Sequence, residues 1–199
     1  MILGGVAFST LALLNAFGST ASGLDVAVAK SLHRIAIEDP GVTHGFLAVT
    51  PLGDVPALTA LTVLASGGLF VSGKRLFAGG FALSMLCVGI ANFALQLAFR
   101  RERPSFLDPV ATAEGWSFPS GHAMGTIVAV GLLTYIAFHW VEHPPRRLLL
   151  LICVAAWVLI MSLSRMVLGV HYLSDVVAGL AAGTTWLALS IKAIERAKA

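Results

Sequence analysis

Uncharged apolar stretches alternate along this chain with short polar segments that contain its charged residues. A helix of about 20 apolar residues is long enough to cross the hydrocarbon core of a bilayer. Such a helix also satisfies its own backbone hydrogen bonds in lipid. The pattern therefore predicts six membrane-spanning helices, which lie approximately within Ile2–Leu24, Val55–Ser72, Leu76–Phe99, Gly121–Trp140, Leu148–Ser164 and Tyr172–Ile191.

Glycine, proline and the apolar spacing predict the local structure of several segments in and between these spans. Proline excludes a regular helix from the segment Arg100–Trp116. Gly179 and Gly183, four residues apart, favour close packing of the last span against a neighbouring helix. In the mixed segment Asp25–Asp54, apolar residues near one helical face predict a short interfacial helix; they are Val26, Ala29, Leu32 and Ile37.

The composition agrees with a membrane protein and excludes a soluble or a disordered one. Of the 199 residues, 57% are hydrophobic and 12% are charged, and the mean hydropathy is +0.88. A soluble domain contains about 25% charged residues. The N-terminus lacks the basic region of a signal peptide, so residues 1–19 are expected to remain as a helix. We predict an all-α integral membrane protein with a single domain over residues 1–199.

The distribution of basic residues predicts how the chain is oriented. Six spans place both termini on one face, and cytoplasmic faces are enriched in lysine and arginine. The face of the termini would carry seven basic residues, Lys74, Arg75, Arg146, Arg147, Lys192, Arg196 and Lys198. The opposite face would carry six, Lys30, Arg34, Arg100, Arg101, Arg103 and Arg165, and two of these are assigned to a site below. We expect a multi-pass plasma (inner) membrane protein with cytoplasmic termini, and no nucleic-acid partner.

Polar residues that can bind an anion gather on the predicted outer face. The guanidinium groups of Arg103 and Arg165 match the geometry of phosphate oxygens. Ser120 and Gly121 lead into the fourth span, where free backbone N–H groups and the positive end of the helix dipole favour an anion. Gly121 also allows a ligand to approach the backbone closely. These residues predict a phosphoryl-binding site.

Two histidines and a carboxylate at the same face are the candidates for catalysis. His171 and Asp175 are four residues apart and share a helical face. The carboxylate can hold one ring N–H and leave the other nitrogen free to attack phosphorus. His122 is the candidate proton donor to the leaving oxygen. The sequence shows no cluster of carboxylates for magnesium, so we expect neither a metal nor a cofactor.

Three ordered motifs resemble the signatures of the type 2 phosphatidic acid phosphatase (PAP2) superfamily. Arg103-Pro104 is similar to the end of the first signature, and Pro119-Ser120-Gly121-His122 matches the second. Ser164-Arg165, followed by His171 and Asp175, resembles the third. The resemblance implies a PAP2-like helical bundle and a metal-independent membrane lipid phosphatase.

The resemblance also implies a role for each matching residue. His171 would form a phosphohistidine that water then hydrolyses, with Asp175 orienting the imidazole and His122 protonating the leaving group. The phosphoryl oxygens would be bound by the remaining matched residues, which are Arg103, Arg165, Ser120 and Gly121.

One position departs from the family pattern. The first signature begins with a lysine seven residues before its arginine, and this chain has Gln96 there. Glutamine keeps a donor but loses the charge, which would weaken binding of the transition state by about 1–2 kcal/mol if nothing compensates. Arg100, four residues later on the same helical face, is the candidate to supply the charge. Otherwise Arg100 and Arg101 are interpreted as anchors for lipid head groups.

The implied substrate is an isoprenoid diphosphate or a glycerolipid phosphate, whose tail enters from the bilayer. Undecaprenyl diphosphate is the first expectation, followed by phosphatidylglycerophosphate and phosphatidate. A lipid phosphotransferase with a sugar-lipid hydroxyl as acceptor would use the same chemistry and stays open. So does a lipid binder or transporter without enzymatic activity. A vanadium site like that of the haloperoxidases resembles this constellation, but the membrane composition and the absence of a large soluble scaffold argue against it. Besides the substrate and membrane lipids no partner is predicted, and the oligomeric state stays open.

Overall fold

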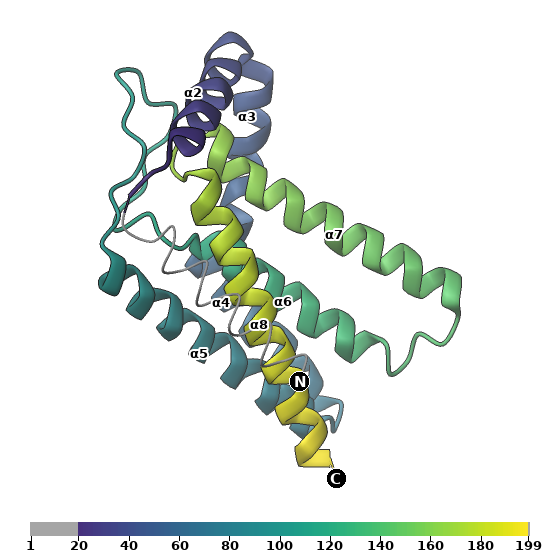
Figure 1. Ribbon diagram of the computed structural model, residues 1–199. Coiled ribbons are helices and arrows are strands. Elements are labelled where there is room, and N and C mark those ends of the chain that lie inside the picture. Colours follow the sequence, from purple (N-terminus) through teal and green to yellow (C-terminus); the bar gives the residue numbers. More distant parts are fainter. Residues whose placement is uncertain (1–19, 199) are drawn as a thin grey trace.

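The computed structural model describes residues 20–198, and within this part of the chain every regular element is helical. The 3-10 helix η1 separates two of the α-helices (Figure 1). In chain order the elements are α2 (Gly23–Glu38), α3 (Pro40–Val49), η1 (Thr50–Gly53), α4 (Val55–Val71), α5 (Arg75–Phe99), α6 (Gly121–Ala137), α7 (Pro144–Val167) and α8 (Leu173–Lys198).

The described helices do not confirm the count of six spans. Three of them, α5, α7 and α8, are long and apolar enough to cross a bilayer. The α3–η1 segment and α4 pass the same test together but are bent by 49°, which gives at most four spans, and α6 is a shorter apolar helix. Most of the first predicted span, within Ile2–Leu24, lies outside the described residues.

The helix α6 forms the centre of the bundle and packs closely against α8. A Cβ atom at Gly179 would lie 2.6 Å from the carbonyl oxygen of Ser120, and one at Gly183 would lie 2.9 Å from that of Met124. These glycines therefore allow the two backbones to approach, as their spacing predicts. The main core between α5, α6 and α8 includes Phe81, Val128 and Leu132, among other residues.

The segment Asp25–Asp54 forms two α-helices and the 3-10 helix η1, and not the single interfacial helix that its pattern predicts. Asp39 caps the start of α3 by accepting hydrogen bonds from the N–H groups of Gly41 and Val42. The buried face of α2 is only partly the predicted apolar one, since Ala29 is buried beside Asp25 and His33, while Val26 and Ile37 are exposed. The reason is that Asp25 binds the buried residues Ser174 and Arg101, and His33 is covered by the loop that follows α5, as described below.

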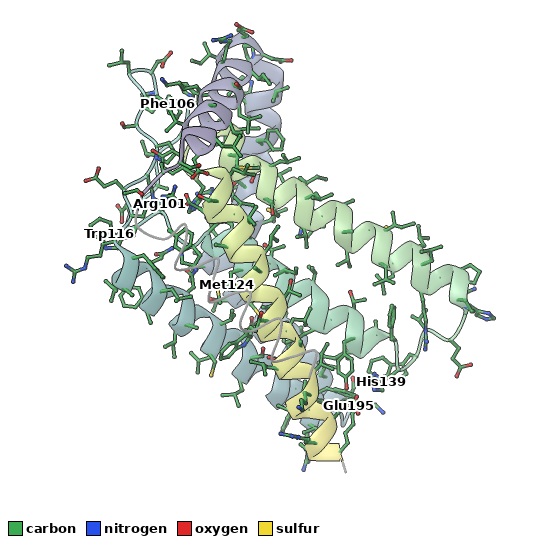
Figure 2. The ribbon with its side chains drawn as sticks, viewed as in Figure 1. Arg101, Phe106, Trp116, Met124, His139 and Glu195 are labelled. Carbon is green, nitrogen blue, oxygen red and sulfur yellow. The ribbon has the colours of Figure 1, made fainter. Side chains whose placement is uncertain are left out.

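Both of these helices lie at one end of the molecule, beside the junction of α7 and α8, and the C-terminus lies at the opposite end (Figure 1). The loop between α5 and α6 is held against α2 at that end. Within it Phe106 stacks on His33 with 3.7 Å between ring centroids, and Asp108 lies 3.1 Å from His33 Nε2. Figure 2 shows Phe106, Trp116 and Arg101 together on this side. The helix α2 thus holds in place the part of the loop that contains Arg103.

Candidate active site

A cavity of about 950 Å³ joins polar residues from distant parts of the chain with an apolar wall. Its polar lining includes both histidines and both arginines that the sequence singled out, which are His122, His171, Arg103 and Arg165. Gln96 and Gly121 line the same cavity. Its apolar wall comes mainly from α4 and α5, with Leu58, Met85, Leu86, Ile90 and Phe93. One space is therefore available to a phosphate and to an apolar chain.

His171 is buried at the turn between α7 and α8. Gly169 has a φ of +73°, and the ring of Phe106 lies 3.0 Å from the position of a Cβ there, so glycine permits this turn. His171 Nδ1 lies 3.4 Å from Asp175 Oδ2, and its Nε2 lies 3.1 Å from Arg103 Nη1. Burial, opposed by the hydrogen bond with Asp175 and assisted by the charge of Arg103, lowers the pKa of His171 to about 4. The imidazole is therefore neutral at pH 7.

Asp175 lies in the first turn of α8 with no exposed surface. An acidic residue is favoured there because the helix dipole is positive at its N-terminus. Its Oδ2 accepts hydrogen bonds from the N–H of Tyr172, at 2.7 Å, and from the hydroxyl of Ser117. Its Oδ1 accepts one from Arg101 Nη1 at 2.8 Å. The carboxylate is therefore held in one orientation toward His171.

Arg101 is buried, so the prediction that it anchors a lipid head group is wrong. Its side chain is 2% exposed and forms ion pairs with Asp25, at 2.9 Å, and with Asp175, at 2.8 Å. It also donates to the hydroxyl of Ser174 at 2.7 Å. Two buried carboxylates attract this guanidinium into the protein, which no local pattern around Arg101 indicates.

Asp25 connects α2 to this network. Burial by itself would raise its pKa, but hydrogen bonds from the backbone and hydroxyl of Ser174, from Ser22 and from Arg101 outweigh it and lower the pKa to about 2. Asp25 is therefore charged at neutral pH. The three buried charges of Asp25, Arg101 and Asp175 form a continuous chain from α2 to the first turn of α8.

Arg103 is held by four backbone carbonyl groups. Its Nε and Nη2 donate to the carbonyls of Gly115, Glu114 and Trp116, and its Nη1 donates to that of Val170 at 2.8 Å. A guanidinium has five N–H groups, so the second N–H of Nη1 remains for the side that faces His171. Burial lowers the pKa of Arg103 while Asp175 opposes this effect, and arginine remains charged at neutral pH.

The second motif forms the start of α6 and contacts the third. The N–H of Ser120 donates to the backbone carbonyl of Asp175 at 3.0 Å. Its hydroxyl is buried and has no hydrogen-bond partner among the described residues. Gly121 is the first residue of α6, whose first N–H groups have no carbonyl one turn earlier to bind. Gly121 lines the cavity and Ser120 does not, so the helix start is the part of this motif that offers donors to an anion there.

Gln96 supports this motif through the backbone. Its Nε2 donates to the carbonyl of Pro119 at 3.2 Å, and Nδ2 of Asn92 donates to the same oxygen at 3.3 Å. Arg100, the predicted substitute for the missing charge, is not among the residues that line the cavity. It has a φ of 46° after the end of α5, and its Nε donates to the carbonyl of Leu97. Arg100 therefore leaves the α-helical conformation, so the spacing of four residues does not place it on the helical face of Gln96.

The remaining two predicted residues contact the segment between α3 and α4. Arg165 Nη1 donates to the hydroxyl of Thr50 at 2.6 Å. His122 Nε2 lies 2.8 Å from Asp54 Oδ1. Sequence reasoning therefore missed four residues that touch the predicted site, Thr50, Asp54, Arg101 and Ser117, and also Asp25, which contacts it through Arg101. Of these residues, only Ser117 could have been suspected from the sequence, because it lies two residues before the second motif.

The comparisons with known proteins agree on one family. A sequence model of the PAP2 superfamily matches residues 77–199. Phosphatidylglycerophosphatase B of Bacillus subtilis (strain 168) is 29% identical over 166 residues, which cover 80% of this chain and 77% of that protein. The decaprenylphosphoryl-5-phosphoribose phosphatase of Mycolicibacterium smegmatis is 35% identical over 153 residues, which cover 70% of this chain and 72% of that protein.

The fold is also similar to solved structures. The transmembrane PAP2-type phosphatidylglycerolphosphate phosphatase from Bacillus subtilis superposes with a TM-score of 0.85 at 25% identity, over 98% of this chain and 96% of that one. LpxE of Aquifex aeolicus superposes with a TM-score of 0.67 at 19% identity, over 88% of this chain and 98% of that one. The second likeness concerns the fold alone.

Proposed function

Because this chain belongs to the PAP2 superfamily, we propose that it is a membrane lipid phosphatase with His171 as nucleophile and His122 as proton donor. Relatives named as phosphatases, and an apolar, all-helical structure, support hydrolysis of a lipid phosphate. The role of His171 rests on the orientation of its two ring nitrogens. His171 Nε2 faces Arg103 Nη1 at 3.1 Å, while its Nδ1 faces Asp175.

The proposed reaction has two steps. His171 Nε2 attacks phosphorus, the bond to the leaving oxygen breaks, and His122 donates a proton to that oxygen. In the second step His122 accepts a proton from water, the resulting hydroxide attacks the phosphohistidine, and the P–N bond breaks to release inorganic phosphate. His171 then returns to its neutral form with Asp175 holding Nδ1–H.

The negative charge of the phosphoryl group would be stabilised by positive charges and hydrogen-bond donors of the protein that are in place before the substrate binds. Arg103 and Arg165 line the cavity and supply two positive charges, and the N-terminus of α6, which begins at Gly121, supplies neutral donors. We propose that Ser120 Oγ, which is buried and has no hydrogen-bond partner among the described residues, adds a further neutral donor. Donors of this kind stabilise charge that develops in the transition state. We propose that Gln96 acts indirectly, by holding the Pro119 carbonyl, and that no metal takes part.

The proposed substrate is a terminal phosphate on a polar head group, with phosphatidylglycerophosphate first. The relatives are named for phosphatidylglycerophosphate and decaprenylphosphoryl-5-phosphoribose, and in both names the terminal phosphate lies on a glycerol or ribose unit. Undecaprenyl diphosphate has no such unit and becomes the second choice. The apolar wall of α4 and α5 suits a lipid tail that enters from the bilayer.

The orientation remains the one that the basic residues predict. We propose six spans with cytoplasmic termini, which requires a helix within Ile2–Leu24 and a crossing by α6. The cavity with His171 then opens at the outer face of the plasma membrane. Cysteine accessibility at Arg100→Cys and Arg146→Cys in whole cells tests this, and labelling of Arg146→Cys from outside would contradict it.

The decisive assay is phosphate release by the purified protein in detergent. Phosphatidylglycerophosphate, decaprenylphosphoryl-5-phosphoribose, undecaprenyl diphosphate and phosphatidate form the panel. We expect release from at least one lipid, with preference for the first, and loss of this activity in His171→Ala. Activity of His171→Ala equal to the wild type would refute the assignment of the nucleophile.

Two additions to the assay distinguish hydrolysis from the competing functions. EDTA should leave the rate unchanged, and strong inhibition would mean that a metal takes part. A hydroxyl-bearing acceptor lipid should leave inorganic phosphate as the product, whereas a phosphorylated acceptor would indicate a phosphotransferase. If the wild type releases no phosphate but binds the lipids, a lipid binder or transporter is the better description.

A further inference from the structure

The break between α3 and α4 lies inside the candidate site although it precedes every PAP2 motif. The segment Thr50–Asp54 contains η1 and the residue before α4, where the helices bend by 49°. It is also outside residues 77–199, the part that the family model matches. The segment packs against α6 and α7, which carry His122 and Arg165. Its polar residues are therefore close enough to contact the side chains of the motifs.

Thr50 contacts the arginine of the third motif. It is 8% exposed, and its hydroxyl accepts a hydrogen bond of 2.6 Å from Arg165 Nη1. Ser164 Oγ lies 3.5 Å from the same oxygen but donates to the carbonyl of Met161. The hydroxyl of Thr50 therefore occupies one donor of Arg165 and fixes the direction of the others.

Gly53 and Asp54 contact the histidine of the second motif. A Cβ at Gly53 would lie 2.7 Å from His122 Cδ2, so the backbone passes directly against the imidazole ring. Asp54 Oδ1 lies 2.8 Å from His122 Nε2, and the Asp54 side chain is 47% exposed where it lines the cavity. This ring nitrogen is buried and forms no hydrogen bond among the described residues, and the carboxylate of Asp54 lies within ion-pair distance of it.

The charges around His122 make this contact important. Burial and the charges of Arg165 and Arg103 disfavour a further positive charge on His122, and a hydrogen bond with the backbone of Thr50 opposes them. A proton donor must nevertheless carry its proton when the leaving oxygen develops negative charge. A carboxylate in contact with the imidazole favours the protonated form.

We infer that the break between α3 and α4 is a fourth part of the active site, in addition to the three PAP2 motifs. In it Asp54 orients His122 and favours its protonated form, and Thr50 orients Arg165. The inference rests on the proposed phosphatase function and adds to it two positioning residues from the N-terminal half of the chain. Asp54 acts through His122 and should matter when the leaving group needs a proton. Thr50 acts through Arg165 and should matter for binding of the phosphoryl group.

The first test compares leaving groups in Asp54→Asn. An alkyl phosphate leaves as a strongly basic alkoxide and needs a proton, whereas 4-nitrophenyl phosphate leaves as a weakly basic phenolate. General acid catalysis contributes about 10²–10⁴-fold, so we expect kcat on the alkyl ester to fall by about 10²-fold. The rate on the aryl ester should fall by less than about threefold.

A double-mutant cycle with His122→Ala tests the same coupling on the alkyl ester alone. If Asp54 acts through His122, Asp54→Asn should have no further effect on the residual rate of His122→Ala. Glu38→Gln, which removes an exposed carboxylate at the end of α2, is the matched control and should keep wild-type kinetics. Equal effects of Asp54→Asn in both backgrounds, wild-type kinetics, or a gain of activity would each overturn the role of Asp54.

The second test measures binding without turnover. Orthovanadate affinity should fall about fivefold to tenfold in Thr50→Val, which corresponds to one lost hydrogen bond, and should recover in Thr50→Ser. Equal vanadate affinities in all three proteins would overturn the role of Thr50. The two failures are distinguishable, because absence of phosphate release by the wild type would refute the proposed function, whereas an active wild type with silent variants would refute this inference alone.

Discussion

Arg101 Nη1 lies 2.8 Å from Oδ1 of Asp175, while the other carboxylate oxygen of Asp175 faces His171. The second terminal nitrogen of Arg101 binds Asp25 at 2.9 Å. A residue of α2 is thus connected through one buried arginine to the carboxylate that orients the proposed nucleophile. The orientation of His171 therefore depends on the packing of α2 and not only on the turn between α7 and α8.

Replacing Arg101 should reduce both stability and activity. Arg101→Met leaves Asp25 and Asp175 buried without their cation, and breaking a buried ion pair costs about 3–5 kcal/mol. We expect the free energy of unfolding in detergent to fall by about this amount. A displaced Asp175 should lower kcat by about 100-fold, as small shifts of catalytic groups do. Arg100→Met, next to it and exposed, is the control that should change neither value.

The pH dependence should show a nucleophile that stays neutral well into the acid range. The pKa of His171 is about 4, below the ordinary value of 6.5, so the imidazole stays unprotonated and nucleophilic at neutral pH. We expect kcat/KM to fall as the pH drops through about 4, because the imidazole then becomes protonated. Phosphate release between about pH 3 and 7 measures this. An acid limb centred near 6.5 would contradict a buried, neutral His171.

Acid unfolding must be measured alongside this pH profile. A histidine with a depressed pKa stabilises the folded state above its unfolded pKa, and this stabilisation declines as pH falls from about 6.5 toward 4. Asp25, with a pKa of about 2, loses its contribution only at still lower pH. Thermal unfolding at each pH therefore separates protonation of the nucleophile from loss of the fold.

Gln96 should act through the loop that carries the second motif. Gln96→Leu removes the hydrogen bond from Nε2 to the Pro119 carbonyl, and one such bond is worth about 1 kcal/mol, or about a fivefold to tenfold change in kcat/KM. Gln96→Lys keeps a donor and adds the charge that the family pattern has, so its activity should rise. Lower activity of Gln96→Lys than of Gln96→Leu would show that this cavity does not accept the added charge.

Gly179 should be required for the contact between α6 and α8. A Cβ in Gly179→Ala would meet the Ser120 carbonyl at 2.6 Å, and overpacking of this kind costs about 1–3 kcal/mol. Because Ser120 belongs to the second motif, phosphate release should fall together with the melting temperature. Gly68→Ala in α4 is the matched control, since it meets nothing within 4 Å and should be neutral or stabilising. Equal behaviour of both variants would contradict the close packing.

The sequence by itself determined the helical class, the approximate limits of α4 to α8 and the candidates for chemistry. These follow from local patterns, because a run of apolar residues sets the length of a membrane helix and motif spacing sets which residues share a helix end. His171 Nδ1 lies 3.4 Å from Asp175 Oδ2, and the spacing of four residues already implies that these side chains can meet.

Only the tertiary structure decided which polar residues surround those candidates. Ser174 binds Asp25, 149 residues earlier in the chain, and Arg165 binds Thr50, 115 residues earlier. Whether an arginine is a buried ion-pair partner, as Arg101 is, or an exposed residue, as Arg100 is, depends on such long-range contacts. Two adjacent arginines have the same local pattern, and only the fold places carboxylates around one of them.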